Sequence, residues 1–342
     1  MIDLNHMQDY WFPGYASQRS IFDFTNGVLN IESPGIPLVP EDSNNFGNVI
    51  TLNNDVGYYI IGKYLMDSAY NVVSGSGGIF DKAPANIACC AFAPDVNNNN
   101  AAHLYFIDAE GLHYGNIKRS MINESSIDSL NLIALSLPPM QNSPLSIMGD
   151  RYADGNWLFY INQQDDTQRL VVAYCSAAQE ITTTHVLLPS AGMPISIDVC
   201  KNRIAVVFDD ASLLYGTLTV SNKMMSVAID DSINGLSHEC VQSAFSASAT
   251  SLFWLTKESK VGYINFRNML TGAVTRQATV GIYKALKRGP DNAIYGLCHR
   301  TKGSSTLLII TPTGPEEEYS VSEIFSSANG GYFPATGWSV YS

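Results

Sequence analysis

The stretch Trp157-Leu158-Phe159-Tyr160 is one of six short apolar segments that recur along this chain of 342 residues. Successive segments begin 46, 53, 47, 48 and 42 residues apart. A repeat of about 40–50 residues, each with its own buried strand, is typical of the blades of a β-propeller. The other five segments are Tyr58–Ile61, Leu104–Ile107, Ile204–Val207, Leu252–Leu255 and Ile294–Leu297.

Each recurring segment is surrounded by further strand patterns. Around Trp157 the pattern Leu145–Met148 comes before it, and Leu170–Tyr174 and His185–Leu188 come after it. Between the first two patterns lies Ala153-Asp154-Gly155-Asn156, the kind of polar turn that joins the strands of a tight hairpin. Four antiparallel strands in every unit are characteristic of a propeller blade, so we expect an all-β chain.

The two ends of the chain each supply part of a unit. Ile21–Phe24 and Val28–Ile31 form a predicted hairpin with no strand expected before it, and Gly337–Tyr341 is a single predicted strand. We therefore expect a seventh blade closed by N- and C-terminal strands, which would remove the open sheet edges of the ring. Ser125–Leu130 is expected to form at most one helical turn, so no helix competes with this fold.

The length allows two domains, but repeat folds of this size often form one. We expect a single seven-bladed β-propeller domain over residues 1–342. Its blades are expected near residues 47–85, 86–138, 143–189, 194–232, 240–280 and 282–325, with a closing blade from 330–342 plus 19–34.

Charge is sparse and acidic. The net charge is −12, and 15 % of the residues are charged against about 25 % in an average protein. Because phosphate binding needs clustered Lys and Arg, this composition argues against nucleic acid as a partner. The short basic patches Lys118–Arg119 and Lys284–Arg288 are interpreted as exposed strand ends or turns. The low charge fits either a β-rich protein or a surface covered by neighbouring subunits.

The six cysteines, Cys89, Cys90, Cys175, Cys200, Cys240 and Cys298, lack the spacing of a disulfide framework or a zinc site, so reduced thiols are favoured over disulfides. Met1–Asp9 has neither a basic start nor an apolar stretch, so no signal peptide is expected. No apolar run is long enough to predict membrane insertion. We expect synthesis in the cytoplasm, with the chain ending in a virion or an extracellular assembly as one possible destination.

The motif search predicts no catalytic, cofactor-binding or metal-binding residue. The sequence has no HExxH, GxSxG, Walker A or EF-hand pattern. The carboxylate pairs Asp165-Asp166, Asp209-Asp210 and Asp230-Asp231 are interpreted as turns, because adjacent side chains on a strand point to opposite faces. Six histidines are scattered over different units without ligand spacing.

Part of the chain resembles the propeller regions of large surface proteins of gliding Bacteroidota that are exported by the type IX system. The resemblance covers roughly residues 11–161. It is carried by Trp11-Phe12-Pro13-Gly14 before Asp23-Phe24, by Gly57–Gly62, and by Phe92-Ala93-Pro94 leading through an Asn-rich turn to Leu104–Tyr114. The chain departs from that family because no export signal and no carboxy-terminal sorting domain are recognised. The resemblance implies a propeller fold and a bacterial or phage setting.

Two functions remain open from the sequence. The first is a non-enzymatic scaffold that binds other proteins as a subunit of a larger assembly, such as a virion, an injection machine or a bacterial surface complex. This hypothesis fits the low charge and the missing motifs. The second is a propeller enzyme, or a glycan-binding lectin, with a site at the central channel or a face groove. Charged side chains converging on one mouth of the channel would favour the second. Because predicted inner strands such as Leu145–Met148 and Val241–Phe245 carry few ionisable residues, we expect the scaffold and no enzymatic activity.

Two long irregular stretches, Ser33–Phe46 and Asp67–Ala85, flank the first full blade. They are either mobile loops without a role or the main footprint of a protein partner. The predicted partner-binding residues are the apolar side chains within them: Ile36, Leu38, Val39 and Phe80.

Overall fold

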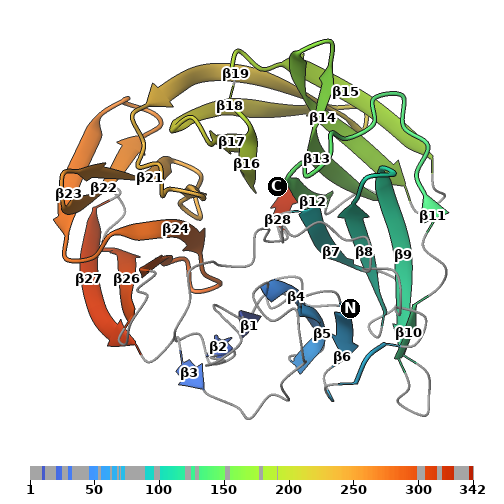
Figure 1. Ribbon diagram of the computed structural model, residues 1–342, viewed down its shortest axis with the longest axis horizontal. Helices are drawn as coiled ribbons and strands as arrows, with labels where there is room; N and C mark the ends of the chain where they lie inside the picture. Colours follow the sequence, from blue (N-terminus) through green and yellow to red (C-terminus); the bar gives the residue numbers. More distant parts are fainter. Residues whose placement is uncertain are drawn as a thin grey trace.

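The computed structural model contains only β-strands joined by turns and irregular segments in the part that it describes. The described residues are 10–11, 21–24, 30–32, 46–52, 55–61, 64–67, 69, 71–73, 89–95, 101–119, 125–127, 131–150, 155–176, 180–190, 192–298, 305–313, 318–326 and 339–341. Their strands form seven sheets arranged around a ring (Figure 1). The prediction of an all-β propeller, with antiparallel sheets arranged around a ring, is confirmed.

Three sheets come from the first part of the chain. They contain β1 (Tyr10–Trp11), β2 (Ile21–Asp23) and β3 (Asn30–Glu32); β4 (Phe46–Leu52), β5 (Asp55–Ile61) and β6 (Tyr64–Asp67); and β7 (Cys90–Pro94), β8 (Ala101–Ile107), β9 (Leu112–Arg119), β10 (Ser125–Ile127) and β11 (Asn131–Leu132).

The next two sheets come from the middle of the chain and share the same antiparallel order. They contain β12 (Leu145–Asp150), β13 (Gly155–Gln164), β14 (Thr167–Ser176) and β15 (Ile181–Leu187); and β16 (Pro194–Cys200), β17 (Arg203–Phe208), β18 (Ser212–Ser221) and β19 (Met224–Asn234).

The last two sheets contain β20 (Ala244–Phe245), β21 (Ser251–Glu258), β22 (Val261–Asn268) and β23 (Val274–Thr279); and β24 (Tyr283–Arg288), β25 (Ile294–Cys298), β26 (Ser305–Pro312) and β27 (Tyr319–Ser326). The final strand, β28 (Ser339–Tyr341), joins the sheet of β12. The first strand of each four-stranded sheet lies toward the centre of the ring, and the last lies at its rim (Figure 1).

The six recurring apolar segments lie in β5, β8, β13, β17, β21 and β25, which are the second strands of their sheets. The turns between strands have the expected geometry. Asp165 and Asp166 join β13 to β14 with φ values of 50° and 58°, and Asn222 and Lys223 join β18 to β19 with 49° and 63°. Positive φ at both central residues is what a two-residue hairpin needs.

The core lies between neighbouring sheets. Trp157, Phe159 and Leu170 of the β12–β15 sheet pack with Ile204 and Val206 of the β16–β19 sheet. A second cluster joins the opposite face of the β16–β19 sheet to the sheets that begin with β20 and β24. Successive side chains of a strand alternate between the two faces, so one central strand contributes to both interfaces. This layering holds the inner strands in fixed positions relative to one another.

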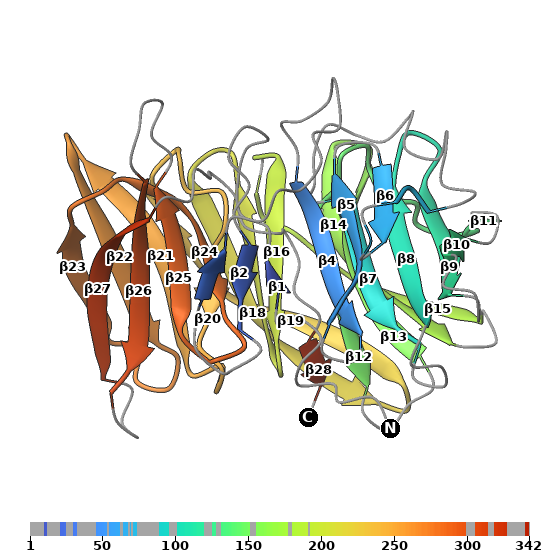
Figure 2. The ribbon, with the colours of Figure 1, turned by 90° about the horizontal axis from the view of Figure 1, so that it is seen from below.

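The structure corrects three details of the predicted strand order. β1 precedes the N-terminal hairpin, although no strand was expected there. Ser125–Ile127 is a strand that pairs with β9 rather than a helical turn. The C-terminal strand β28 pairs in parallel with β12, and the described pairings of the N-terminal sheet are those among β1, β2 and β3. The side view shows β28 beside β12, toward one face of the ring (Figure 2).

Truncating Trp157 is expected to destabilise the fold strongly. Trp157 is fully buried between two sheets, so Trp157→Ala leaves a large cavity and should cost about 3–5 kcal/mol. Val261 is 42 % exposed, so Val261→Ala should change stability by less than about 0.5 kcal/mol. Urea denaturation followed by circular dichroism measures both. Equal midpoints for the two variants would contradict the packing described here.

Candidate functional site

Three charged residues gather at one end of the inner strands. Asp198 lies near the end of β16, and Lys287 and Arg288 are the last two residues of β24. Between these strands lies β20, which contacts both of them. β16 and β24 each end just before the hairpin that leads outward to the next strand. The charged residues therefore lie at the same mouth of the ring.

The backbone of Phe245 connects the two sides of this cluster. Asp198 Oδ2 accepts a hydrogen bond of 3.0 Å from the Phe245 N–H. Arg288 Nη1 donates a hydrogen bond of 3.3 Å to the carbonyl oxygen of the same residue. A carboxylate from one sheet and a guanidinium from another thus hold the short inner strand of the sheet between them.

Burial dominates the electrostatics of the cluster. It lowers the pKa of Lys287 to about 7, although the charge of Asp198 acts in the opposite direction. Burial also raises the pKa of Asp198, and the Arg288 charge and the Phe245 N–H offset only part of this rise. Lys287 is 8 % exposed, whereas Asp198 and Arg288 are half-buried. A lysine with a pKa near 7 can exchange a proton at neutral pH, which suits a general base or acid.

A thiol lies next to the same cluster. Cys200, the last residue of β16, donates a hydrogen bond of 3.4 Å from Sγ to the carbonyl oxygen of Ser246. Burial raises the pKa of Cys200, and the charge of Arg288 acts against this rise. The thiol is therefore protonated at neutral pH and packs as a small apolar side chain.

The sequence interpretation of these residues was wrong in one respect. Lys284–Arg288 was interpreted as an exposed strand end or turn, but it lies within an inner strand and Lys287 is buried. The sequence signal that could have revealed the site is the presence of charged residues within two otherwise largely apolar inner strands. In Ile195-Ser196-Ile197-Asp198-Val199 the polar residues share one face of the strand, and Lys287 follows the apolar run Ala285-Leu286.

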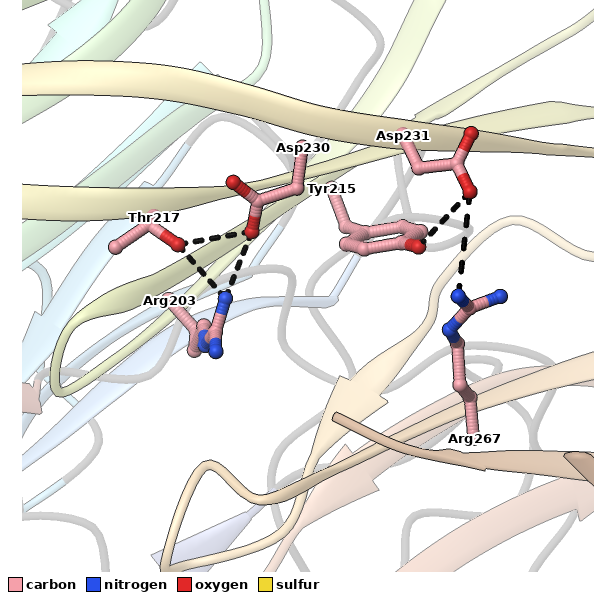
Figure 3. A network of polar contacts seen from close by, with 6 residues as sticks. All are labelled: Arg203, Tyr215, Thr217, Asp230, Asp231 and Arg267. Carbon is pink, nitrogen blue, oxygen red and sulfur yellow. Dashed lines mark hydrogen bonds and ion pairs between the residues drawn. The ribbon is translucent and has the colours of Figure 1, made fainter. Parts of the chain in front are cut away.

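A second polar network lies farther out, across the sheets of β16–β19 and β20–β23 (Figure 3). Arg203 Nη1 lies 2.7 Å from both Asp230 Oδ2 and Thr217 Oγ1. Tyr215 donates a hydrogen bond of 3.2 Å to Asp231 Oδ2, and Arg267 Nη2 lies 4.0 Å from the same oxygen.

Asp230 and Asp231 lie inside β19, so their interpretation as a turn was wrong. The ladder with β18 shifts by one residue between Tyr215 and Gly216, which is a β-bulge. The bulge breaks the usual alternation, and both carboxylates reach the face of β18 that carries Tyr215 and Thr217 (Figure 3). Each carboxylate thus has a cation or hydroxyl partner within the β16–β19 sheet, and Arg267 alone of the six residues comes from the neighbouring sheet. Asp165-Asp166 and Asp209-Asp210 do lie in turns.

Two of the described histidines make hydrogen bonds to neighbouring side chains, and five of the cysteines are buried. His113 Nε2 lies 3.0 Å from Asp108 Oδ1 and stacks on Phe106, and His103 shares a hydrogen bond of 2.8 Å with Tyr114. Cys89, Cys175, Cys200 and Cys240 are buried free thiols, and Cys90 is buried as well. Within the described ranges no three His, Cys, Asp or Glu side chains are grouped as metal ligands.

The predicted partner-binding residues Ile36, Leu38, Val39 and Phe80 lie outside the described residues, so binding of a protein partner there stays a prediction. At the start of the second long stretch, Asp67 Oδ1 accepts hydrogen bonds from the N–H groups of Ala69 and Asn71. Across the residues that the structure places, no helix has the length and hydropathy needed to span a bilayer.

Comparison with known proteins gives fold relatives only. No family model and no curated protein matches the sequence. A solved structure from Bacteroides uniformis ATCC 8492, described as "a putative 6-phosphogluconolactonase", aligns with a TM-score of 0.55 and 10 % identity over 95 % of this chain and 100 % of its own.

Two further solved structures align over most of the chain. Periplasmic gluconolactonase from Pseudomonas aeruginosa has a TM-score of 0.49 and 10 % identity, over 95 % of this chain and 98 % of its own. The WD40 domain of SCAP from fission yeast has a TM-score of 0.47 and 8 % identity, over 95 % of this chain and 86 % of its own.

These findings correct the predicted function. The non-enzymatic scaffold and the expectation of no enzymatic activity are both set aside, because the Bacteroides uniformis structure with this fold is named as a lactonase. The inner stretches named in support of the scaffold, Leu145–Met148 and Val241–Phe245, carry no ionisable residue, but the inner strands β16 and β24 carry Asp198, Lys287 and Arg288. The resemblance to type IX exported proteins and the predicted cellular location stay predictions.

Burial of Lys287 makes stability depend on pH in a defined direction. Its pKa is about 7 in the folded protein and about 10.4 in an unfolded chain, so the unfolded state binds more protons between these values. Stability should therefore rise with pH from 7 to 10, by up to about 1.4 kcal/mol per pH unit, and this contribution is lost as pH falls to 7. Thermal melts at several pH values, with Lys287→Met as reference, measure it. Parallel pH curves for the two proteins would show that Lys287 is not buried.

Asp198 and Arg288 should be energetically coupled through Phe245. Asp198→Asn or Arg288→Met alone leaves the other charge less compensated and should cost about 1–3 kcal/mol, while the double variant should cost less than the sum. The exposed pair Lys257–Glu239, 3.1 Å apart, is the matched control and should show a coupling below about 1 kcal/mol. Denaturant unfolding of both mutant cycles tests this. Additive costs at Asp198 and Arg288 would contradict the bridge.

Proposed function

We propose that this chain is a β-propeller enzyme whose active site lies at the mouth of the ring formed by the ends of β16, β20 and β24. The observation that carries the proposal is the convergence there of Asp198, Lys287 and Arg288, two of them half-buried and the third almost fully buried. Perturbed ionisable groups that converge from separate strands are typical of active sites. Packing of the fold alone does not require such a cluster, because taking charged groups out of water costs stability.

The proposed reaction is hydrolysis of a sugar-acid lactone. The fold relative from Bacteroides uniformis suggests this substrate class, and the side chains supply chemistry that suits it. Neutral Lys287 takes a proton from water as the water oxygen attacks the lactone carbonyl carbon. The ring C–O bond then breaks, and the leaving alkoxide oxygen takes the proton back from the Lys287 ammonium group, which gives the hydroxy acid and regenerates the neutral amine.

Arg288 and Asp198 have supporting roles in this proposal. The Arg288 guanidinium stays charged at all relevant pH values, so it stabilises the negative charge that develops on the carbonyl oxygen. Asp198 accepts the Phe245 N–H and acts on Lys287 through its charge. We assign it as a positioning residue that keeps the inner strands and the amine in place.

We also propose the finer architecture of a ring with seven blades. Seven sheets surround the centre, and the β1–β3 sheet lies between the β24–β27 sheet and the β4–β6 sheet (Figure 1). In this proposal the N-terminal sheet is the seventh blade. Contact between Phe24 and Tyr295, whose rings are 5.5 Å apart in an edge-to-face arrangement, supports its packing against the preceding sheet.

Lactone hydrolysis gives a direct test. We expect the protein to hydrolyse gluconolactone or its 6-phosphate faster than the spontaneous reaction, with kcat/KM rising as pH passes through 7. Lys287→Met should reduce kcat at least about 100-fold, the range for a lost general base. The control is Lys284→Met on the same strand, which should retain activity.

Two results would contradict the proposal. One is a rate no faster than spontaneous hydrolysis for every lactone, and the other is an equal loss in the Lys287 and Lys284 variants. Calorimetry with gluconate distinguishes an enzyme from a glycan-binding protein. Binding of gluconate without hydrolysis of any lactone would indicate the glycan-binding protein.

A further inference from the structure

The C-terminal strand occupies an unusual place in this fold. β28 pairs in parallel with β12, with Ser339 opposite Met148, Val340 opposite Gly149 and Tyr341 opposite Asp150. β12 is the inner strand of its sheet, so β28 adds a fifth strand on the side that faces the centre of the ring (Figure 1). The other four-stranded sheets described here end at their inner strands.

β28 lies at the same mouth of the ring as the charged cluster. Its partners Met148–Asp150 form the second half of β12, just before the segment that leads to β13. Asp198 has the equivalent place in β16, close to the turn that leads to β17. β28 also contacts β16, the strand that carries Asp198. A strand from the far end of the chain therefore covers the inner side of two strands beside the site.

We propose that β28 is a strap over the site at the mouth of the ring, and that it must leave β12 before a substrate can reach Asp198. The inference rests on the proposed function for the identity of that substrate, but the covering of Asp198 by β28 can be measured without it. A substrate and the strap compete for the same inner side, so binding of one favours release of the other.

The pairing of β28 is suited to a reversible contact. It involves three residues of each strand, whereas β13 pairs with β14 over ten. Parallel pairs are less stable per residue than antiparallel ones, and each backbone hydrogen bond contributes little net stability. The strap can therefore open without unfolding the sheets that build the ring.

The experiment measures how fast Asp198 reacts in the full chain and in strap variants. A water-soluble carbodiimide with glycinamide couples to accessible carboxyl groups, and peptide mass spectrometry reports each site. The variants are a truncation that removes residues 338–342, and Val340→Pro, because proline removes a backbone N–H and fixes φ near −65°, away from the extended strand value. Val340→Thr, which keeps the strand propensity, is the matched control. Asp166 in an exposed hairpin is the internal reference.

The strap predicts that Asp198 reacts at least about fivefold faster in the truncation and in Val340→Pro than in the full chain or Val340→Thr. Asp166 should react equally in all four proteins. The melting temperature should fall by no more than about 3 °C, the shift expected when a small contact is lost. An unchanged rate at Asp198 overturns the strap. A fall of more than about 10 °C also overturns it, because β28 would then be needed to hold the ring together.

Lactone hydrolysis measured on the same proteins separates the two proposals. Faster reaction of Asp198 without hydrolysis in any variant supports the strap and contradicts the lactonase. Hydrolysis by the full chain with an unchanged rate at Asp198 supports the lactonase and contradicts the strap.

Discussion

The structure depends on one packing constraint: a sheet in the ring must bury both of its faces against its two neighbours. β17 shows how one strand meets it. Ile204 and Val206 pack toward the β12–β15 sheet, while Ala205 and Val207 pack toward the sheets on the other side. Because both faces are apolar, the central strands are continuous apolar runs and not alternating ones. The position of each sheet within the ring thus follows from its own side chains, and in the described part of the chain no helix covers a sheet.

The same constraint explains where polar chemistry can occur. The middle strands are buried on both faces, so ionisable groups are tolerated mainly at strand ends and at the rim. At the inner ends, Asp198 and Arg288 compensate each other through the two backbone groups of Phe245. Lys287 is buried beside them, and its burial lowers its pKa to about 7. Charged side chains therefore gather where the inner strands end, at one mouth of the ring.

The sequence predicted the repeating part of this fold well, for a physical reason. Strand formation in Leu252–Leu255 depends on local apolar composition, and the hairpin at Asp165-Asp166 depends on residues that adopt positive φ. Both signals are contained within a few neighbouring residues.

The features that were missed depend on long-range pairing. The partner of β28 lies almost 200 residues away in β12, and the site joins residues of β16, β20 and β24. No local pattern specifies which of several inner edges a short strand will join. Likewise, the burial of Lys287 follows from the neighbouring sheets and not from the residues around it.

The bulge in β19 determines whether the strand tolerates deletion of a single residue. Deleting one codon from a regular strand turns every later side chain to the opposite face of the sheet. At Asp230-Asp231 two residues already oppose one on β18, and Gly216 leaves room there, since a Cβ on it would lie 2.3 Å from the Ala228 carbonyl oxygen. Losing either aspartate codon would restore a regular ladder and leave both halves of β19 facing as before. An in-frame deletion of one aspartate codon is therefore compatible with the fold of β19. Such a deletion would remove one carboxylate from the strand.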